Sequence, residues 1–228
     1  MAKQPGKDNF TRNLVIAVVV GVLLIMLVPT LLSRQTDSSA SIPANVSADR
    51  GYGVVFNEEL TGVPVVDIYE DFQCPVCAQF TQLNGPYIES LIAEKKATVV
   101  YHTLSFLGPE SALAANAAAC SSDENKFLGF HKAFYQNLPA ENAGVVTAEY
   151  LIALGEFADI KSPKFGECVK NLNYKEWVNN VAASGGEKNI NSTPTVFING
   201  KEIRRGTSGT DLGEYFDAAA FVKAVEGK

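Results

Sequence analysis

The longest apolar run of the chain lies near its start. Residues 14–32 read LVIAVVVGVLLIMLVPTLL and carry no charged side chain. Because a helix needs about 20 apolar residues to cross the hydrocarbon layer of a membrane, this run predicts a single transmembrane anchor. Residues 1–13 contain three basic side chains and one acidic one, and basic residues favour the cytoplasmic side. We therefore expect residues 1–13 in the cytoplasm and the rest of the chain beyond the membrane.

A cleaved signal peptide is the alternative interpretation of this run. The apolar core of a signal peptide usually has about 7–15 residues and is followed closely by small residues. Here the best cleavage-like triplet, Val46-Ser47-Ala48, lies well beyond the apolar run. The uncleaved anchor is favoured, and both interpretations place the remaining chain outside the cytoplasm.

Residues 33–50 differ in pattern from everything that follows. They are rich in Ser, Ala and Asp and show no apolar periodicity, which indicates a flexible spacer. A single folded domain is expected over residues 51–228. Its first clear element is the β-branched run 62–69 (GVPVVDIY), which is typical of a buried central strand.

The periodicity then changes from helix to strand and back. Residues 76–96 show helical spacing, with Pro86 expected to kink or break the helix, and residues 97–106 alternate as a second strand. From residue 107 to residue 191 the periodic segments are all helical. These segments are 109–120, 126–137, 147–157, 164–172 and 174–189.

Strand character returns near the end of the chain. Residues 195–198 and 202–204 flank Asn199-Gly200, a dipeptide typical of hairpin turns, and a last helix is expected over residues 212–225. The order strand, helix, strand, helices, hairpin, helix predicts an α/β domain with an all-helical insertion at about 107–191.

Composition narrows the functional classes. The 228 residues carry a net charge of −6 and 46% of them are apolar, so the chain is long enough for one domain with a real core. An acidic chain lacks the basic surface that phosphate backbones require, which argues against nucleic-acid binding. Since neither a GxxxxGK[ST] nor a GxGxxG run is present, a phosphate-binding loop has no support, and we expect no cofactor.

Two of the four cysteines stand close together, in the segment Cys74-Pro75-Val76-Cys77. A zinc site would need two further ligands at suitable spacing. The chain offers only His102 and His131, which lie on different predicted elements and are expected to be packing residues, so no metal is predicted. A redox pair requires its first cysteine where a strand leads into a helix, and Cys74 has this context.

The predicted position of Cys74 has an electrostatic consequence. Free backbone N–H groups and the dipole at a helix start both stabilise a thiolate, so we expect a lowered pKa for Cys74 and a more ordinary one for Cys77. Pro75 fits the first helical turn, where its missing N–H costs nothing. A stabilised thiolate makes the disulfide a stronger oxidant, and the strength of this effect stays open.

Cys120 and Cys168 stand alone in two different predicted helices. Unpaired thiols are a liability in an oxidising compartment, which makes these two residues candidates for a structural disulfide within the helical insertion. The alternative is a pair of buried apolar cysteines.

A second motif, Thr193-Pro194-Thr195, places a proline directly before the predicted strand 195–198. Together with residues 71–77 (DFQCPVC) and the helical block 107–191, this motif resembles the thioredoxin superfamily and, more narrowly, the DsbA-like proteins. The resemblance covers residues 63–227. The anchor and the second cysteine pair resemble the membrane-anchored actinobacterial type. The resemblance implies a thioredoxin fold with an inserted helical domain.

The resemblance also implies roles for individual residues. Cys74 is expected to be the exposed nucleophile and Cys77 the buried resolving thiol. Pro194 is expected to be a cis-proline beside them, and Thr193 to present backbone groups to an extended substrate peptide, as strand addition does. Val76 is expected to tune the redox potential; many DsbA proteins have His there, and Val lacks its charge.

Three acidic residues precede the cysteine pair. One of them is expected to be a buried proton acceptor for Cys77, as acidic groups are in this superfamily. Asp67, on the central strand, is the candidate for this tuning role. Glu70 and Asp71 are expected to be solvated carboxylates at the strand end.

The function that the resemblance implies is that of a dithiol oxidase. Such an enzyme would pass its Cys74–Cys77 disulfide to exported proteins with free cysteines and would be reoxidised by a membrane quinone-linked partner of the DsbB or VKOR type. Two alternatives stay open: a reductase or isomerase of the same fold, and a redox-silent peptide-binding chaperone that uses the groove beside Pro194.

Overall fold

The computed structural model describes residues 14, 16–19, 40–206 and 211–227. The chain divides into two compact units, Met1–Gln35 and Thr36–Lys228. In the first unit the described residues are helical and exposed. Residues 1–13 and most of the anchor predicted at 14–32 lie outside the described residues. Among the residues described, no helix is both long enough and apolar enough to span a bilayer.

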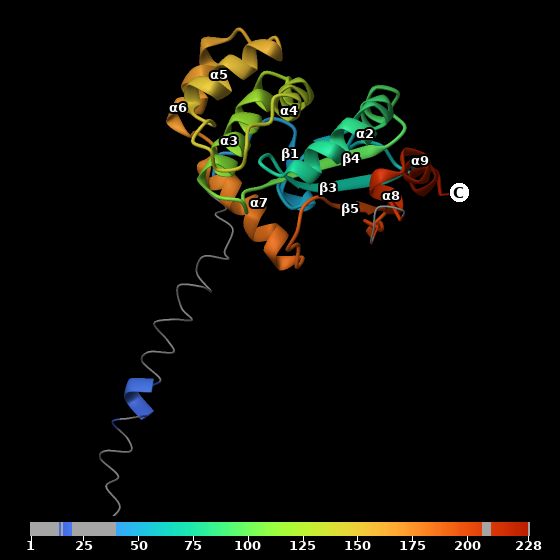
Figure 1. Ribbon diagram of the computed structural model, residues 1–228, viewed down its shortest axis with the longest axis horizontal. Coiled ribbons are helices and arrows are strands. Elements are labelled where there is room, and N and C mark those ends of the chain that lie inside the picture. The colour runs from blue at the N-terminus through green and yellow to red at the C-terminus, as the bar shows by residue number, and fades with distance from the viewer. Residues whose placement is uncertain (1–13, 15, 20–39, 207–210, 228) are drawn as a thin grey trace, which may run out of the picture. The chain divides into compact units, whose positions relative to one another are not determined.

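The second unit is built around one mixed sheet (Figure 1). Over its described residues the strand order is β1-β2-β4-β3-β5-β6. β3 and β4 run parallel, and the other neighbouring pairs are antiparallel. The strands are Val46–Ser47 (β1), Gly53–Phe56 (β2), Val65–Asp71 (β3), Thr98–Leu104 (β4), Thr195–Ile198 (β5) and Lys201–Glu202 (β6).

The parallel pair β3–β4 forms the centre of the sheet, and helix α2 (Pro75–Ala93) connects the two strands. All seven residues of β4 are buried, as β-branched central strands usually are. The two central strands and the intervening helix are therefore confirmed. Pro86 was expected to kink or break this helix; α2 continues through it as one helix, so no break occurs. Pro86 and Gln82, whose carbonyl loses its helical donor, are both exposed, so water can replace the missing hydrogen bond.

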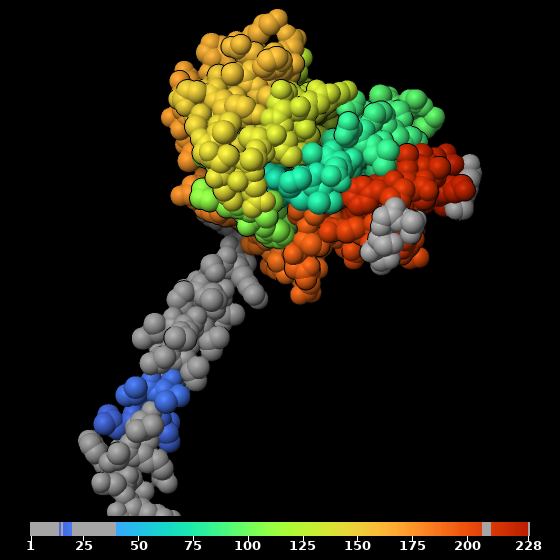
Figure 2. Space-filling view, viewed as in Figure 1, coloured from blue at the N-terminus to red at the C-terminus, as the bar shows by residue number. Residues whose placement is uncertain are grey.

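Between β4 and β5 the chain forms the predicted helical insertion. Figure 1 shows α3 to α6 gathered beyond one end of the sheet, while α7 returns along β4. The surface of this block adjoins that of α2 (Figure 2). The helices are Pro109–Asp123 (α3), Phe127–Gln136 (α4), Ala148–Phe157 (α5), Pro163–Asn171 (α6) and Lys175–Glu187 (α7).

The start of the fold differs from the expectation. Strands β1 and β2 were not predicted, and β1 lies within the segment 33–50 that was expected to be a flexible spacer. The backbone of Ala44 is held from both sides: its N–H donates to Asp123 Oδ1 at 2.9 Å, and its carbonyl accepts from Ser122 Oγ at 2.6 Å. The folded domain therefore begins before Gly51. Strands of two and four residues are too short for a sequence pattern to show their periodicity.

The end of the chain forms two helices, α8 (Gly213–Phe216) and α9 (Ala218–Glu226), instead of the single helix predicted at 212–225. The helical path is interrupted at Asp217. Its carboxylate accepts hydrogen bonds from the N–H groups of Ala219 and Ala220 in α9 and acts as the N-cap of that helix. Tyr215 and Phe221 pack their rings on Phe80 of α2, with centroids 5.7 and 5.6 Å away.

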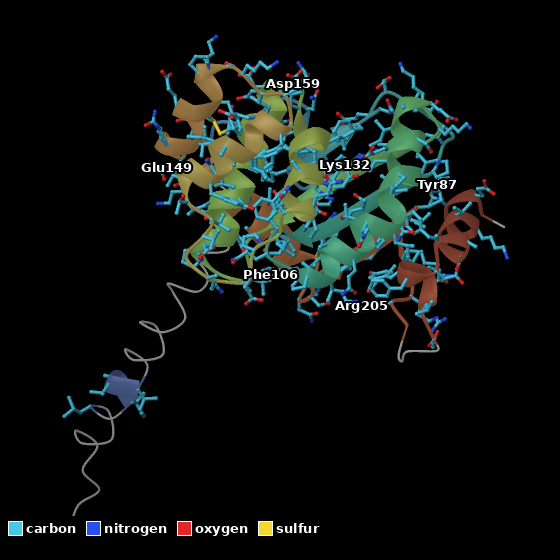
Figure 3. All side chains as sticks on the ribbon, turned by 45° about the horizontal axis from the view of Figure 1, so that its top comes forward. Tyr87, Phe106, Lys132, Glu149, Asp159 and Arg205 are labelled. Carbon is cyan, nitrogen blue, oxygen red and sulfur yellow. A yellow bond between two sulfur atoms is a disulfide. The ribbon has the colours of Figure 1, made fainter. Side chains whose placement is uncertain are left out.

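Cys120 of α3 and Cys168 of α6 form a disulfide, with Cα atoms 5.9 Å apart. It is the yellow bond in the helical block of Figure 3. The bond closes a loop across a sequence separation of 48 residues and so ties α3, the first helix of the insertion, to α6.

We predict that removing this disulfide weakens the fold. In the chain-entropy model a loop of this length contributes about 4 kcal/mol, so the double variant Cys120→Ala, Cys168→Ala should lose a large part of that free energy of unfolding. Urea titration of the domain in the oxidised state measures the loss. An unchanged unfolding midpoint would contradict the stabilising role, and an unchanged Cys74–Cys77 potential is expected as the control.

Candidate active site

The two cysteines without a disulfide lie where β3 gives way to α2. β3 ends at Asp71, and Cys74 is the N-cap residue of α2, with Pro75 in the first helical turn. The Cys74 N–H donates to the Asp71 carbonyl at 2.9 Å, which closes the turn. Cys74 is only 6% exposed, so it is largely buried and not exposed as the resemblance implied, and Cys77 is fully buried as expected. The strand-to-helix context expected for a redox pair is present.

Hydrogen-bond donors around the Cys74 sulfur lower its pKa to about 6. The largest contribution comes from the Cys77 thiol, followed by the Thr193 side chain and the backbone N–H groups of Cys77 and Val76, while burial acts in the opposite direction. These two N–H groups are among those that a helix start leaves without an internal partner. Val76 therefore serves the thiolate through its backbone, although its side chain carries no charge.

Cys77 behaves in the opposite way. Burial raises the pKa of its thiol well above the ordinary value, and the hydrogen bond with Cys74, the charge of Cys74 and the charge of Glu70 raise it further. At neutral pH the reduced pair therefore consists of a Cys74 thiolate and a Cys77 thiol. This division suits a nucleophile and a resolving group.

A segment more than a hundred residues away completes the site. The Thr193–Pro194 peptide bond is cis, and the Thr193 carbonyl oxygen lies 3.5 Å from the Cys74 sulfur. Pro194 is buried, and its carbonyl accepts from the Arg205 guanidinium, which also lies over the Tyr215 ring. The structure thus brings together the two motifs on which the sequence resemblance rested.

Asp71 is fully buried and not a solvated carboxylate, as the sequence suggested. It accepts hydrogen bonds from Gln73 N at 2.9 Å, from Leu107 N at 3.0 Å and from Ser111 Oγ at 2.6 Å. Burial raises the pKa of its carboxyl group, and these donors oppose the rise. The carboxylate therefore joins the active-site turn to the start of the helical insertion.

Of Glu70 and Asp67, it is Glu70 whose charge raises the pKa of Cys77. Asp67 is three positions away from Glu70, and since side chains alternate along a strand, the two point to opposite faces of the sheet. Asp67 pairs with His102 at 3.1 Å, on the face where Lys188 contacts Tyr69. The structure therefore does not support the predicted tuning role of Asp67, because the strand turns its carboxylate away from α2.

Glu70 lies on the face covered by α2 and α4 and is 1% exposed. Its carboxylate pairs with His131 of α4 at 2.8 Å. Both histidines of the chain are thus partners of carboxylates and more than packing residues. Burial lowers the pKa of His102, and the Asp67 carboxylate opposes the decrease.

Sequence reasoning gave Glu70, Asp71 and His131 other roles, as solvated carboxylates and a packing residue, and it missed Gln73 and Arg205. For Glu70 a signal was available, because the alternation of β3 separates it from Asp67. For the others no local pattern exists, since their partners come from distant parts of the chain.

Comparison with known proteins agrees with this geometry. A family model described as thioredoxin matches residues 61–218, and the chain belongs to the thioredoxin family. No curated protein sequence matches the chain.

Solved structures narrow the class. MdbA, a thiol-disulfide oxidoreductase from Actinomyces oris, has a TM-score of 0.68 and 26% identity over 86% of this chain and 95% of that one. DsbA from Mycobacterium tuberculosis has a TM-score of 0.62 and 27% identity over 77% and 91%. BdbD from Bacillus subtilis, at 21% identity and a TM-score of 0.65 over 83% and 98%, shares the fold. The predicted class, a DsbA-like thiol–disulfide oxidoreductase, is confirmed.

We predict that alkylation of Cys74 in the reduced protein is half-maximal near pH 6, because its pKa is lowered to about 6 and only the thiolate reacts. Replacing the strongest donor, in Cys77→Ala, should move the midpoint upward. Cys77→Ser, which keeps a hydroxyl donor, should move it less. Iodoacetamide kinetics across this range measure the midpoint. A wild-type midpoint near the ordinary thiol value of 9.0 would contradict the geometry.

Proposed function

We propose that the protein is an extracytoplasmic dithiol oxidase, which introduces disulfides into exported proteins through Cys74 and Cys77. The observation that carries this proposal is the separation of the two pKa values, lowered to about 6 at Cys74 and raised at Cys77. A thiolate held at the start of a helix stabilises the reduced enzyme, and a stable reduced form makes the disulfide a strong oxidant.

The exchange proceeds in two steps. A substrate thiolate attacks the Cys74 sulfur, the Cys74–Cys77 bond breaks, and Cys77 leaves with the electron pair. The second substrate thiol loses its proton, attacks the mixed disulfide at the substrate sulfur, and releases Cys74 as a thiolate. The substrate dithiol is oxidised by two electrons and the enzyme disulfide is reduced by two. Cys74 is the better leaving group because its pKa is the lower of the two.

The Thr193 backbone provides the place where the substrate is held. Its carbonyl lies beside the Cys74 sulfur at the start of β5, so an extended peptide that pairs with this segment would bring its own cysteine to the sulfur. Main-chain pairing of this kind is independent of substrate sequence, as an enzyme with many exported substrates requires.

The direction of exchange is part of the proposal. Many DsbA proteins carry a histidine where this chain has Val76, and here four uncharged donors act on Cys74 instead. A reductase or isomerase function is the alternative interpretation of the same site. A redox-silent chaperone is less well supported, since a binder has no use for two thiols with opposite pKa shifts.

The cellular setting is also proposed. The apolar run 14–32 would anchor the chain in the membrane with residues 1–13 in the cytoplasm and the catalytic domain outside. Newly exported proteins with free cysteines would be the substrates. A membrane quinone-linked reoxidase of the DsbB or VKOR type would restore the Cys74–Cys77 disulfide.

For the direction of exchange, we predict a Cys74–Cys77 potential well above the thioredoxin value of about −270 mV. Equilibration of the purified domain, residues 40–228, with glutathione buffers measures it. A value at or below that of thioredoxin would assign the protein to the reductases. The control is Cys74→Ser, which should abolish oxidation of a dithiol peptide; full activity of this variant would favour the chaperone.

For the cellular setting, we predict that the full chain stays with the membrane after an alkaline carbonate wash, whereas a chain starting at residue 40 is released. A membrane-impermeant maleimide should label Cys74 in intact cells, because the domain faces outward. Labelling only after lysis would contradict the proposed orientation. A released full-length protein would contradict the anchor.

A further inference from the structure

The carbonyl of the cis-proline is held by a residue that has no part in the exchange described above. Pro194 is buried, and its carbonyl oxygen accepts a hydrogen bond from the guanidinium of Arg205, which is labelled in Figure 3. The same guanidinium lies over the ring of Tyr215, 5.5 Å from its centroid. Because a guanidinium is planar, it can donate along its edge while its face covers an aromatic ring. Arg205 therefore joins the cis-proline to Tyr215.

Tyr215 is in turn fixed both to the strand that follows the cis-proline and to the helix that carries the two cysteines. Its hydroxyl oxygen accepts a hydrogen bond from the N–H of Val196 at 2.8 Å. Its backbone carbonyl accepts from the side chain of Asn84 in α2 at 2.9 Å, and its ring packs on Phe80 of the same helix. Tyr215 is 1% exposed, so close packing leaves it little room to move. Together, Arg205 and Tyr215 form a bracket between α2 and the start of β5.

The backbone next to Arg205 is held by close contacts. The N–H of Glu214 donates to the Arg204 carbonyl at 2.8 Å, and the N–H of Arg204 donates to the Glu214 carboxylate at 2.7 Å. Gly206 has a φ of +89°, and a Cβ atom there would lie 2.3 Å from the Asp211 carbonyl oxygen, so the chain needs glycine at this position. These contacts fix the point from which the Arg205 side chain reaches the cis-proline.

The bracket acts on the segment with which a substrate peptide is proposed to pair. The Thr193 carbonyl lies 3.5 Å from the Cys74 sulfur, and the next carbonyl along the chain is the one that Arg205 occupies. A buried carbonyl requires a hydrogen-bond donor. Without the guanidinium, the Pro194 carbonyl would be unpaired, and the segment would have to turn it toward water or another donor. Such a turn would also move the Thr193 backbone, because the two carbonyls belong to adjacent peptide units.

We propose that Arg205 is a positioning residue for peptide substrates. Through the Pro194 carbonyl and the Tyr215 ring, it holds the Thr193 backbone in the orientation with which an extended peptide pairs. The inference rests on the proposed function and adds that peptide binding and exchange with small dithiols depend on different residues. A small dithiol has no main chain to align, so its exchange with the Cys74–Cys77 disulfide does not need the bracket.

A comparison of two substrates tests the proposal. The oxidised full-length protein is mixed with excess dithiol peptide or with dithiothreitol, and the rate of the first turnover is followed as the substrate concentration rises. Arg205→Met keeps an apolar stem and removes the donors and the charge. It should raise the half-saturating peptide concentration about tenfold, as expected for the loss of one charge-assisted hydrogen bond. The maximal rate with peptide and the rate constant with dithiothreitol should stay within about twofold of the wild type. An unchanged peptide dependence, or an equal loss with dithiothreitol, would overturn the proposal.

Arg204→Met is the matched control. Arg204 carries the same charge one residue earlier, but its side chain is exposed and pairs with Asp211. This variant should keep the wild-type values with both substrates, and an equal effect would make the change one of net charge and refute the role of Arg205. If Arg205→Met does not fold, Arg205→Lys takes its place, because lysine keeps the charge and a donor without the planar fork. A smaller rise with the peptide alone is then expected, and no rise would contradict the inference.

Peptides with an altered main chain separate positioning from packing. N-methylation of the two amides that flank the first cysteine of the peptide removes main-chain donors and keeps every side chain. It should raise the half-saturating concentration with the wild-type protein and add no further rise with Arg205→Met, because both changes remove the same main-chain pairing. Losses that simply add would show that Arg205 acts on something other than this pairing, and the proposal would fall.

The outcome also distinguishes this inference from the proposed function. If the wild-type protein does not oxidise the peptide, or if Cys74→Ser oxidises it at the full rate, the proposed oxidase fails. If the wild type oxidises the peptide through Cys74 and Arg205→Met matches it with both substrates, the role of Arg205 fails and the oxidase stands.

Discussion

The low pKa of Cys74 depends on hydrogen-bond donors that converge on its sulfur at the start of α2. The surrounding fold holds these donors in position. Two donors are backbone N–H groups of the helix itself, one is the neighbouring thiol, and one comes from Thr193. The helix is fixed by the β3–α2–β4 crossover, and Thr193 is fixed by the pairing of β5 with β3. A thiolate costs little in this position because the donors are already in place before the charge develops.

The helical insertion has a second role in this arrangement. Its residues Leu107 and Ser111 donate hydrogen bonds to Asp71 and so hold the turn before Cys74. Its residue His131 pairs with Glu70. Its own shape is tied by the Cys120–Cys168 disulfide. The insertion and the active site are therefore joined by polar contacts at two carboxylates, those of Asp71 and Glu70.

The sequence predicts those elements of the fold whose pattern depends on residues that are neighbours along the chain. The β-branched run before Cys74, the helical spacing after it and the proline before β5 each depend on neighbouring residues, and these elements are where the pattern put them. The burial of Asp71 could not be predicted, because an acidic residue at a strand end is normally solvated and two of its three donors, Leu107 and Ser111, lie 36 and 40 residues away. β1 and β2 were missed for a similar reason: they are ordered by partners on β4 and α3, not by their own periodicity.

One consequence follows from the two ends of the sheet. The outermost described strands, Val46–Ser47 and Lys201–Glu202, have two residues each, and the second is charged and exposed. Edges this short give a passing unfolded chain almost no backbone to pair with, and charged side chains weaken such pairing further. A thiol–disulfide oxidoreductase that accepts unfolded chains, as proposed for this one, would be at risk of binding them along the edges of its own sheet. Short, charged edges limit such association, so under the proposed function the segment beside Cys74 is left as the backbone with which a substrate peptide pairs.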